Sequence, residues 1–159
     1  MKLSSSGATP PLRLWNSVTW LLNHLAGSGR RLLHAEIGGA SERNAYGVLS
    51  GLLELAPINQ ADLSKSTGFD KGDLARVLEI FESRGLIERN SNPDDRRNKI
   101  IVLTNSGKKE LYRLDPMVGD AQEALLKPLS PDERAQLVDM LQRLLVYHES
   151  YSPIGTDKT

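Results

Sequence analysis

Two charged clusters in the middle of the chain have the residue types and spacing that suit contacts to nucleic acid. The first is Lys71-Gly72-Asp73 followed by Arg76, and the second is Asp95-Arg96-Arg97. An arginine guanidinium can bind a guanine edge or a phosphate through two hydrogen bonds at once. An aspartate can accept a hydrogen bond from the amino group of cytosine. Both clusters therefore need elements that hold them at a surface.

Two short helices joined by a tight turn are predicted to carry the first cluster. Asn59 and Asp70 are good N-cap residues, and each is followed three residues later by an acid that suits the helix dipole. Gly68 and Gly85 can adopt the left-handed conformation that closes a helix. The second helix has one apolar face with i, i+3, i+4 and i+7 spacing, formed by Leu74, Val77, Leu78 and Phe81. Its opposite face carries the first cluster.

A β-hairpin is predicted to carry the second cluster at its tip. Residues 86–89 and 99–103 read as its two strands, the latter rich in β-branched residues. The segment 91–98 contains Asn, Pro and Asp, which favour turns, and no apolar side chain that could bury the tip. Helix, turn, helix and a wing with arginines at its tip are typical of a winged helix-turn-helix. In such a motif the second helix enters the DNA major groove with its N-terminal residues against base edges.

The same residues resemble the MarR family of bacterial transcriptional regulators, and a weaker resemblance extends over residues 12–147. The residues that carry it are Leu63, Gly68, Leu74-Ala75-Arg76, Phe81-Glu82, Arg84-Gly85-Leu86-Ile87-Glu88-Arg89, Pro93, Asp95-Arg96-Arg97, Leu103-Thr104 and Gly107. The resemblance implies that the second helix lies in the major groove and that Arg97, oriented by Asp95, enters the minor groove. It also implies a ligand-responsive repressor whose dimer is held by the N- and C-terminal helices.

Each of these site residues has a simpler interpretation that the sequence leaves open. Arg76 could be a solvated surface arginine. Asp73 departs from the family pattern, in which a small hydroxylated residue is usual, and it could be only a capping acid. Arg96 and Arg97 could form exposed ion pairs, which usually contribute little to stability.

Composition predicts one soluble, compact domain. The 159 residues have ordinary hydrophobic and charged fractions and no cysteine, which excludes disulfides and thiol-based redox sensing. The formal net charge is zero, but segments 1–56, 57–113 and 114–159 carry +2, +2 and −4. The acidic excess therefore lies away from the proposed DNA-binding region. Polar residues interrupt the apolar N-terminal stretch, so we expect no signal peptide or membrane span and a cytoplasmic location.

The fold class expected is mostly α with a small β-hairpin wing, flanked by N- and C-terminal dimerisation helices. The expected organisation is a tail at 1–11, a dimerisation helix region at 12–40, the winged helix-turn-helix at 41–104, C-terminal dimerisation helices at 105–150 and a tail at 151–159. The apolar stripes of the terminal helices have no obvious partner within one small winged unit. We therefore expect a homodimer that buries Trp15, Leu22, Leu141 and Leu145.

Three irregularities are expected in the flanking helices. Gly27-Ser28-Gly29 should bend or break the first helix, because each glycine costs about 1 kcal/mol in a helix interior. Ser41 is the expected N-cap of the helix that precedes Pro57. Pro116 should kink or break its helix near Asp115, since proline lacks a backbone donor and clashes with the preceding turn.

An effector is implied by the resemblance alone: a small, mostly apolar or anionic molecule bound between the dimer helices and the motif. The candidate ligand-binding residues are Trp15, Trp20, Arg31, His34 and Arg43. The three histidines lack metal-ligand spacing, and no Gly-rich phosphate loop or catalytic triad order is present. We therefore expect no metal, no cofactor and no enzymatic activity.

The function expected is sequence-specific DNA binding by a homodimeric transcriptional repressor. Its operator should be a pseudo-palindrome with half-sites about 10 bp apart, because a two-fold dimer presents two reading helices one helical turn apart. The alternative is a winged-helix module that contacts another protein and does not bind DNA.

Overall fold

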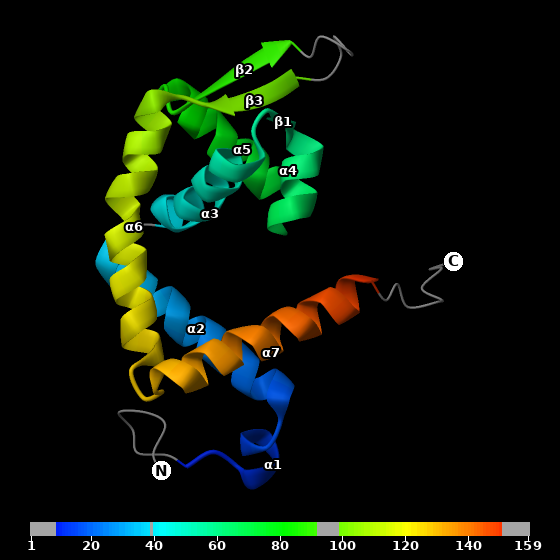
Figure 1. Ribbon diagram of the computed structural model, residues 1–159, viewed down its shortest axis with the longest axis vertical. Coiled ribbons are helices and arrows are strands. Elements are labelled where there is room, and N and C mark those ends of the chain that lie inside the picture. Colours follow the sequence, from blue (N-terminus) through cyan, green and yellow to red (C-terminus); the bar gives the residue numbers. More distant parts are fainter. Residues whose placement is uncertain (1–8, 39, 92–98, 151–159) are drawn as a thin grey trace. The chain divides into compact units, whose positions relative to one another are not determined.

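The computed structural model describes residues 9–38, 40–91 and 99–150, and of residues 40–43 and 149–150 it describes the backbone alone. The chain forms two units, residues 1–122 and residues 123–159. The elements in chain order are α1 (Leu12–Trp15), α2 (Val18–Ile37), α3 (Ala40–Leu55), β1 (Ile58–Asn59), α4 (Gln60–Thr67), α5 (Lys71–Ser83), β2 (Ile87–Ser91), β3 (Lys99–Leu103), α6 (Asn105–Leu126) and α7 (Pro131–Ser150). Figure 1 shows this order from blue to red.

The core of the first unit lies where α3, α4, α5 and the hairpin meet. Its largest fully buried side chains come from these elements and from α6: Leu49 and Leu52 from α3, Leu63 from α4, Leu74, Leu78 and Phe81 from α5, Ile87 and Ile101 from the strands, and Leu114 from α6. The predicted apolar face of α5 is confirmed, since all four of its residues are buried. Burial of a whole leucine or phenylalanine side chain contributes about 1.5–3 kcal/mol, so this cluster holds α5 in place.

The predicted hairpin is confirmed, with β2 extending two residues further than expected. β2 pairs with β3 in antiparallel register, with Arg89 opposite Ile101 and Ser91 opposite Lys99. A third strand, β1, was not predicted from the sequence. It is two residues long and pairs with β3 on the other side, with Ile58 opposite Ile101. The sheet order is therefore β1-β3-β2, and β1 leads directly into α4.

The expected break at Gly27-Ser28-Gly29 is wrong. α2 runs without interruption from Val18 to Ile37, and the chain breaks earlier, at Asn16 and Ser17. Ser17 caps α2, and its hydroxyl oxygen accepts a hydrogen bond from the backbone N–H of Trp20 at 3.4 Å. A side-chain cap fixes a helix start, whereas isolated glycines only weaken a helix that is supported on both sides.

Two further expectations about helix ends and breaks are also corrected. α3 begins at Ala40, so Ser41 lies inside its first turn and is not its N-cap. α6 runs unbroken from Asn105 to Leu126 with Pro116 inside it. An interior proline costs about 3 kcal/mol. Buried residues on both sides of Pro116 offset this cost, and these are Leu111, Leu114, Val118 and Ala121.

The second unit consists of the end of α6 and α7. Ser130 and Glu133 form the predicted capping box: the backbone N–H of Ser130 donates to the Glu133 carboxylate at 2.8 Å, and the backbone N–H of Glu133 donates to the Ser130 hydroxyl at 3.4 Å. The bond from the Ser130 backbone lowers the pKa of Glu133. The Arg134 guanidinium closes the turn by donating to the carbonyls of Leu126 and Leu129 and to Glu123. Within the described ranges, no helix has the length and apolarity needed to span a bilayer.

Candidate nucleic-acid interface

α3 is the platform on which the two motif helices rest. A Cβ atom at Gly47 would lie 3.0 Å from the ring of Phe69, which is in the turn between α4 and α5. A Cβ atom at Gly51 would lie 2.8 Å from the Thr67 side chain and 3.3 Å from Leu63. The two glycines are four residues apart and share one face of α3. They allow α4 and the turn to approach the α3 backbone closely.

The turn between α4 and α5 is fixed by side-chain hydrogen bonds. Ser64 is buried, and its hydroxyl donates to the backbone carbonyl of Phe69 at 2.8 Å. Gly68 is in the left-handed region, with φ 71°, as predicted. Asp70 caps α5, since its carboxylate accepts from the backbone N–H groups of Gly72 at 2.8 Å and Asp73 at 3.2 Å. The start of α5 is therefore fixed by its N-cap residue.

The outer face of α5 presents the first predicted cluster to solvent. Lys71, Gly72, Asp73 and Arg76 are all exposed, and the Arg76 side chain keeps 76% of its accessible surface. Its guanidinium lies 3.9 Å from the Asp73 carboxylate in an exposed pair, which contributes little to stability. Arg76 can therefore leave Asp73 for a base or a phosphate at small cost. Ile80, one turn further along, is also partly exposed.

The wing is fixed at its base by Thr104 and Gly107, two residues of the family motif. The Thr104 hydroxyl donates to the carbonyls of Gly85 and Leu86 at 2.8 and 3.0 Å, and it accepts from the backbone N–H of Gly107 at 3.0 Å. Thr104 thereby caps α6 as predicted and ties it to the end of α5. The wing-tip residues Asp95, Arg96 and Arg97 lie outside the described residues.

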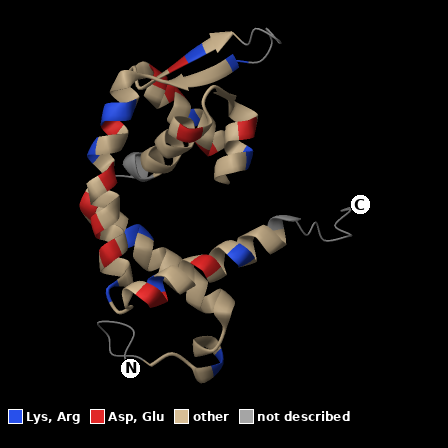
Figure 2. Ribbon diagram, viewed as in Figure 1, with Lys and Arg blue, Asp and Glu red and all other residues tan. Residues whose placement is uncertain are grey.

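Two cations outside the predicted clusters lie beside the first cluster. Arg89 on β2 and Lys99 on β3 line a surface hollow of about 370 Å³ together with Lys71, Asn59, Gln60 and Ala61. Figure 2 shows a basic position on each strand of the hairpin. The sequence signal was present, because both cations flank the wing tip. Their convergence with Lys71 depends on the sheet register and on the approach of β1 to β3, which the sequence did not reveal.

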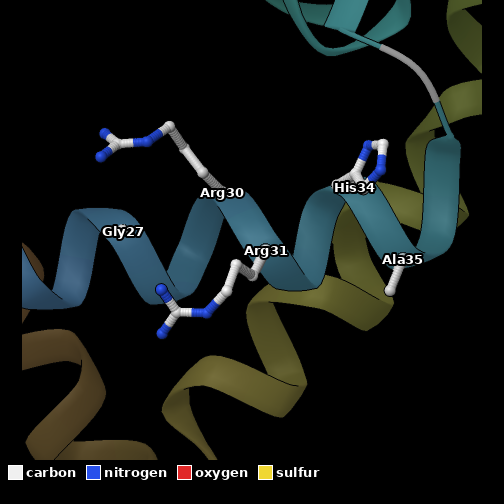
Figure 3. A pocket seen from close by; sticks show the side chains of 5 residues that line it. All are labelled: Gly27, Arg30, Arg31, His34 and Ala35. Atoms are coloured by element: carbon white, nitrogen blue, oxygen red, sulfur yellow. The ribbon is translucent and has the colours of Figure 1, made fainter.

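Two of the predicted effector residues, Arg31 and His34, lie together on α2. They line a hollow of about 400 Å³ with Gly27, Arg30 and Ala35 (Figure 3). A Cβ atom at Gly27 would lie 3.6 Å from the Arg31 guanidinium and 3.8 Å from that of Arg30, so the two cationic groups flank this glycine. Arg31 also donates to the Ser28 hydroxyl at 2.8 Å. This hollow is suited to a small anion.

The other predicted effector residues do not line this hollow. Trp15 and Trp20 contact each other edge to face, with ring centroids 6.3 Å apart, and Trp20 also stacks on His24 at 3.8 Å. Trp15 lines a separate, smaller hollow with Thr9, Pro10 and Leu12. The side chain of Arg43 lies outside the described residues. In the described part of the chain, no group of three or more His, Cys, Asp or Glu residues could hold a metal ion.

Comparison with known proteins identifies the family. Residues 42–99, which span α3 to the start of β3, match the family model described as MarR family. The multiple antibiotic resistance protein MarR of Escherichia coli is 33% identical over 101 residues, which cover 63% of this chain and 70% of that protein. The chain belongs to the MarR family. The winged-helix fold expected from the resemblance is thereby confirmed.

Two further MarR-type proteins extend the comparison. The HTH-type transcriptional repressor NicR of Pseudomonas putida is 29% identical over 97 residues, which cover 61% of each protein. The matched part of the chain thus spans about three fifths of the length of that relative. The crystal structure of a mutant MarR from Escherichia coli complexed with operator DNA has 27% sequence identity and a TM-score of 0.72, and the match covers 86% of this chain and 99% of that one.

Proposed function

We propose that this protein is a sequence-specific DNA-binding transcriptional regulator that acts as a homodimeric repressor in the cytoplasm. The observation that carries the proposal is the exposed N-terminal half of α5, held rigidly by the buried opposite face of the same helix. A rigid helix with exposed polar residues at its N-terminus suits insertion into the major groove. The operator complex of the related Escherichia coli MarR mutant and the repressor NicR support the same role.

The site residues divide by the groove that they face in this proposal. Gly72, Asp73 and Arg76 lie in the major groove, with Lys71 at its edge, and Arg76 reads a guanine edge or binds a phosphate. Gly72 leaves room for the backbone to approach the bases. Arg96 and Arg97 lie at the minor groove, whose negative potential attracts arginine, and Asp95 orients Arg97.

The dimer is supported by apolar side chains that stay exposed in one chain. On α2 these include Leu22 at 41% exposure, and on α7 Leu145 at 62%. Other exposed apolar residues of α7 are Val138, Met140, Leu144 and Val146. Burial of such residues against a second copy is favourable by about 25 cal/mol per Å² of apolar surface. We propose that the first helix and the last two form this interface and that the dimer binds a pseudo-palindromic operator.

Release from DNA is proposed to follow binding of a small anionic or apolar effector along α2. The two guanidinium groups that flank Gly27 are its carboxylate-binding candidates, with His34 at the next turn. The His34 ring nitrogen Nδ1 is hydrogen bonded to the carbonyl of Gly38, which leaves Nε2 available to the effector.

The test compares Arg76→Ala with Arg143→Ala on operator and on scrambled duplex. Arg143 is a matched control, because it is equally exposed at 76% and forms a similar exposed pair with Asp139. The operator is obtained by selection from random-sequence duplexes. Arg76→Ala should weaken operator binding by about 1–3 kcal/mol and relax the preference at one position per half-site, and Arg143→Ala should change neither.

Arg97→Ala should change DNA binding in a different way from Arg76→Ala, because the minor groove is recognised mainly by its width and A·T content. It should weaken binding to both duplexes and reduce the slope of log K against log salt by about one ion per subunit. Unchanged affinity and slope on both duplexes would show that the wing does not touch DNA. The alternative of a protein-contact module would then be favoured.

A further inference from the structure

We propose that the hollow lined by Lys71, Arg89 and Lys99 seats the phosphodiester strand that separates the two DNA grooves. This inference rests on the proposed function and adds a backbone contact that the first residue of α5 shares with both strands of the hairpin. The hollow has a volume of about 370 Å³, and three cations from three different elements line it. It is therefore built by the tertiary fold and is not a basic run along one helix.

The position of the hollow matches the course of the DNA backbone. Lys71 is the first residue of α5, which enters the major groove in the proposed complex, and Lys99 is the first described residue after the wing tip. The major and minor grooves of a duplex are separated by a sugar-phosphate strand. A protein that places a helix in one groove and a wing in the other must pass that strand between them. The hollow lies between these two elements.

The donors around the hollow suit phosphate oxygens. Lys71 and Lys99 are exposed, and neither forms an ion pair among the described residues. Gln60 and Ala61 are the first two residues of α4, and a first-turn N–H group has no partner within its own helix. The hollow therefore combines two exposed lysines with the N-terminal end of α4, and both features favour an anion.

Arg89 lines the hollow and is held by an ion pair with Glu82. Its Nε atom is buried, lies 3.2 Å from the Glu82 carboxylate and has no partner with hydrogen-bond geometry. Because Nε is buried, a phosphate seated in the hollow would bind the terminal N–H groups of the same guanidinium. Two acids lie by these residues: Glu82 pairs with Arg89, and Asp62 in the first turn of α4 accepts a hydrogen bond from the side-chain amide of Asn59 at 2.6 Å.

Salt titrations of DNA binding test the proposal on the selected operator and on a scrambled duplex. Lys71→Gln and Lys99→Gln each remove one phosphate contact, so each should reduce the slope of log K against log salt by about 0.9 per subunit on both duplexes. Lys71→Arg and Lys99→Arg keep the charge and should keep the wild-type slope. Lys109→Gln is the control, because it removes an exposed lysine of α6 that does not line the hollow.

A second measurement locates the contact on the DNA. Methylphosphonate linkages, which carry no charge, replace the phosphates of the strand between the grooves one at a time. One replacement should weaken wild-type binding and leave the binding of Lys71→Gln almost unchanged. Thermal unfolding of each variant should match the wild type, because both lysines are exposed.

The outcomes separate this inference from the proposed function. If both glutamine variants keep the wild-type slope while Arg76→Ala still weakens operator binding, the phosphate site is wrong and the proposed function stands. If the wild-type protein binds neither duplex at low salt, both are overturned.

Discussion

The hydroxyl of Ser64 on α4 donates a 2.8 Å hydrogen bond to the backbone carbonyl of Phe69, five residues later. The bond crosses the turn of the helix-turn-helix, and the ring of the same Phe69 lies so near α3 that a Cβ atom at Gly47 would be 3.0 Å from it. It therefore connects the platform, the first motif helix and the start of the reading helix. We expect this hydrogen bond to support the orientation of α5.

Replacement of Ser64 by alanine should destabilise the protein by about 1 kcal/mol, because the partly buried hydrogen bond to the carbonyl of Phe69 is lost. The midpoint of urea unfolding measures the change. Ser66→Ala on the same helix is the control, and since Ser66 is exposed it should change stability by less than about 0.5 kcal/mol. Equal midpoints for the two variants would show that the Ser64 bond does not support the turn.

Gly107 and Gly119 on α6 should respond in opposite directions to alanine. A Cβ atom at Gly107 would overlap the backbone carbonyl of Leu86 and press on the Leu103 side chain, whereas one at Gly119 would meet nothing within 4 Å. Gly107→Ala should therefore cost about 1–3 kcal/mol through overpacking. Gly119→Ala should be neutral or stabilising by up to about 1 kcal/mol, because alanine favours the helix. Chemical denaturation of both variants checks the contrast, and a stable Gly107→Ala protein would contradict the close contact.

Acid should weaken the junction between α5 and α6 through Glu110. Hydrogen bonds from the Arg113 guanidinium, with Arg84 adding its charge at 3.3 Å, hold the pKa of Glu110 below its ordinary value of 4.5. A carboxylate whose pKa is lower in the folded state stabilises the protein above its unfolded pKa and loses that contribution as the pH falls through the folded value.

Glu110→Gln should therefore cost about 1 kcal/mol or less at pH 7 and should reduce the loss of stability below pH 4.5. Urea midpoints measured from neutral to acidic pH give both quantities. Glu88→Gln on β2 removes an exposed carboxylate that forms no ion pair in the described part of the chain, and it should leave the acid dependence unchanged. If Glu110→Gln and the wild type lose stability in parallel below pH 4.5, the junction does not depend on this carboxylate.

The proposed homodimer should depend on Leu145, which is 62% exposed in the single chain. Light scattering of the wild-type protein should give about twice the chain mass of 17.6 kDa at micromolar concentration. Leu145→Glu should raise the dissociation constant at least about tenfold, since a charge would be buried at the interface. Gln142→Glu adds the same charge at a polar position and should keep the dimer. A stable wild-type monomer would exclude the interface.

The sequence by itself determined the features that depend on neighbours along the chain. The caps at Asn59, Asp70 and Ser130 and the buried face of α5 follow from hydrogen-bonding side chains and helical periodicity, and the structure confirms each of them. The MarR signature was readable for the same reason, because its residues lie within one continuous stretch. The exposed position of Arg76 then follows directly, since it lies opposite the buried face.

Tertiary structure decided the features that depend on contacts between distant segments. α2 continues through Gly27-Ser28-Gly29, and α6 continues through Pro116. In each helix the free-energy cost of glycine or proline in one turn is offset by capping and burial elsewhere in the helix. β1 is a strand only because β3 pairs with it. The meeting of Lys71, Arg89 and Lys99 depends on that pairing and on the hairpin register. The local sequence does not predict such pairings, because their free energy comes from contacts that exist only after the chain has folded.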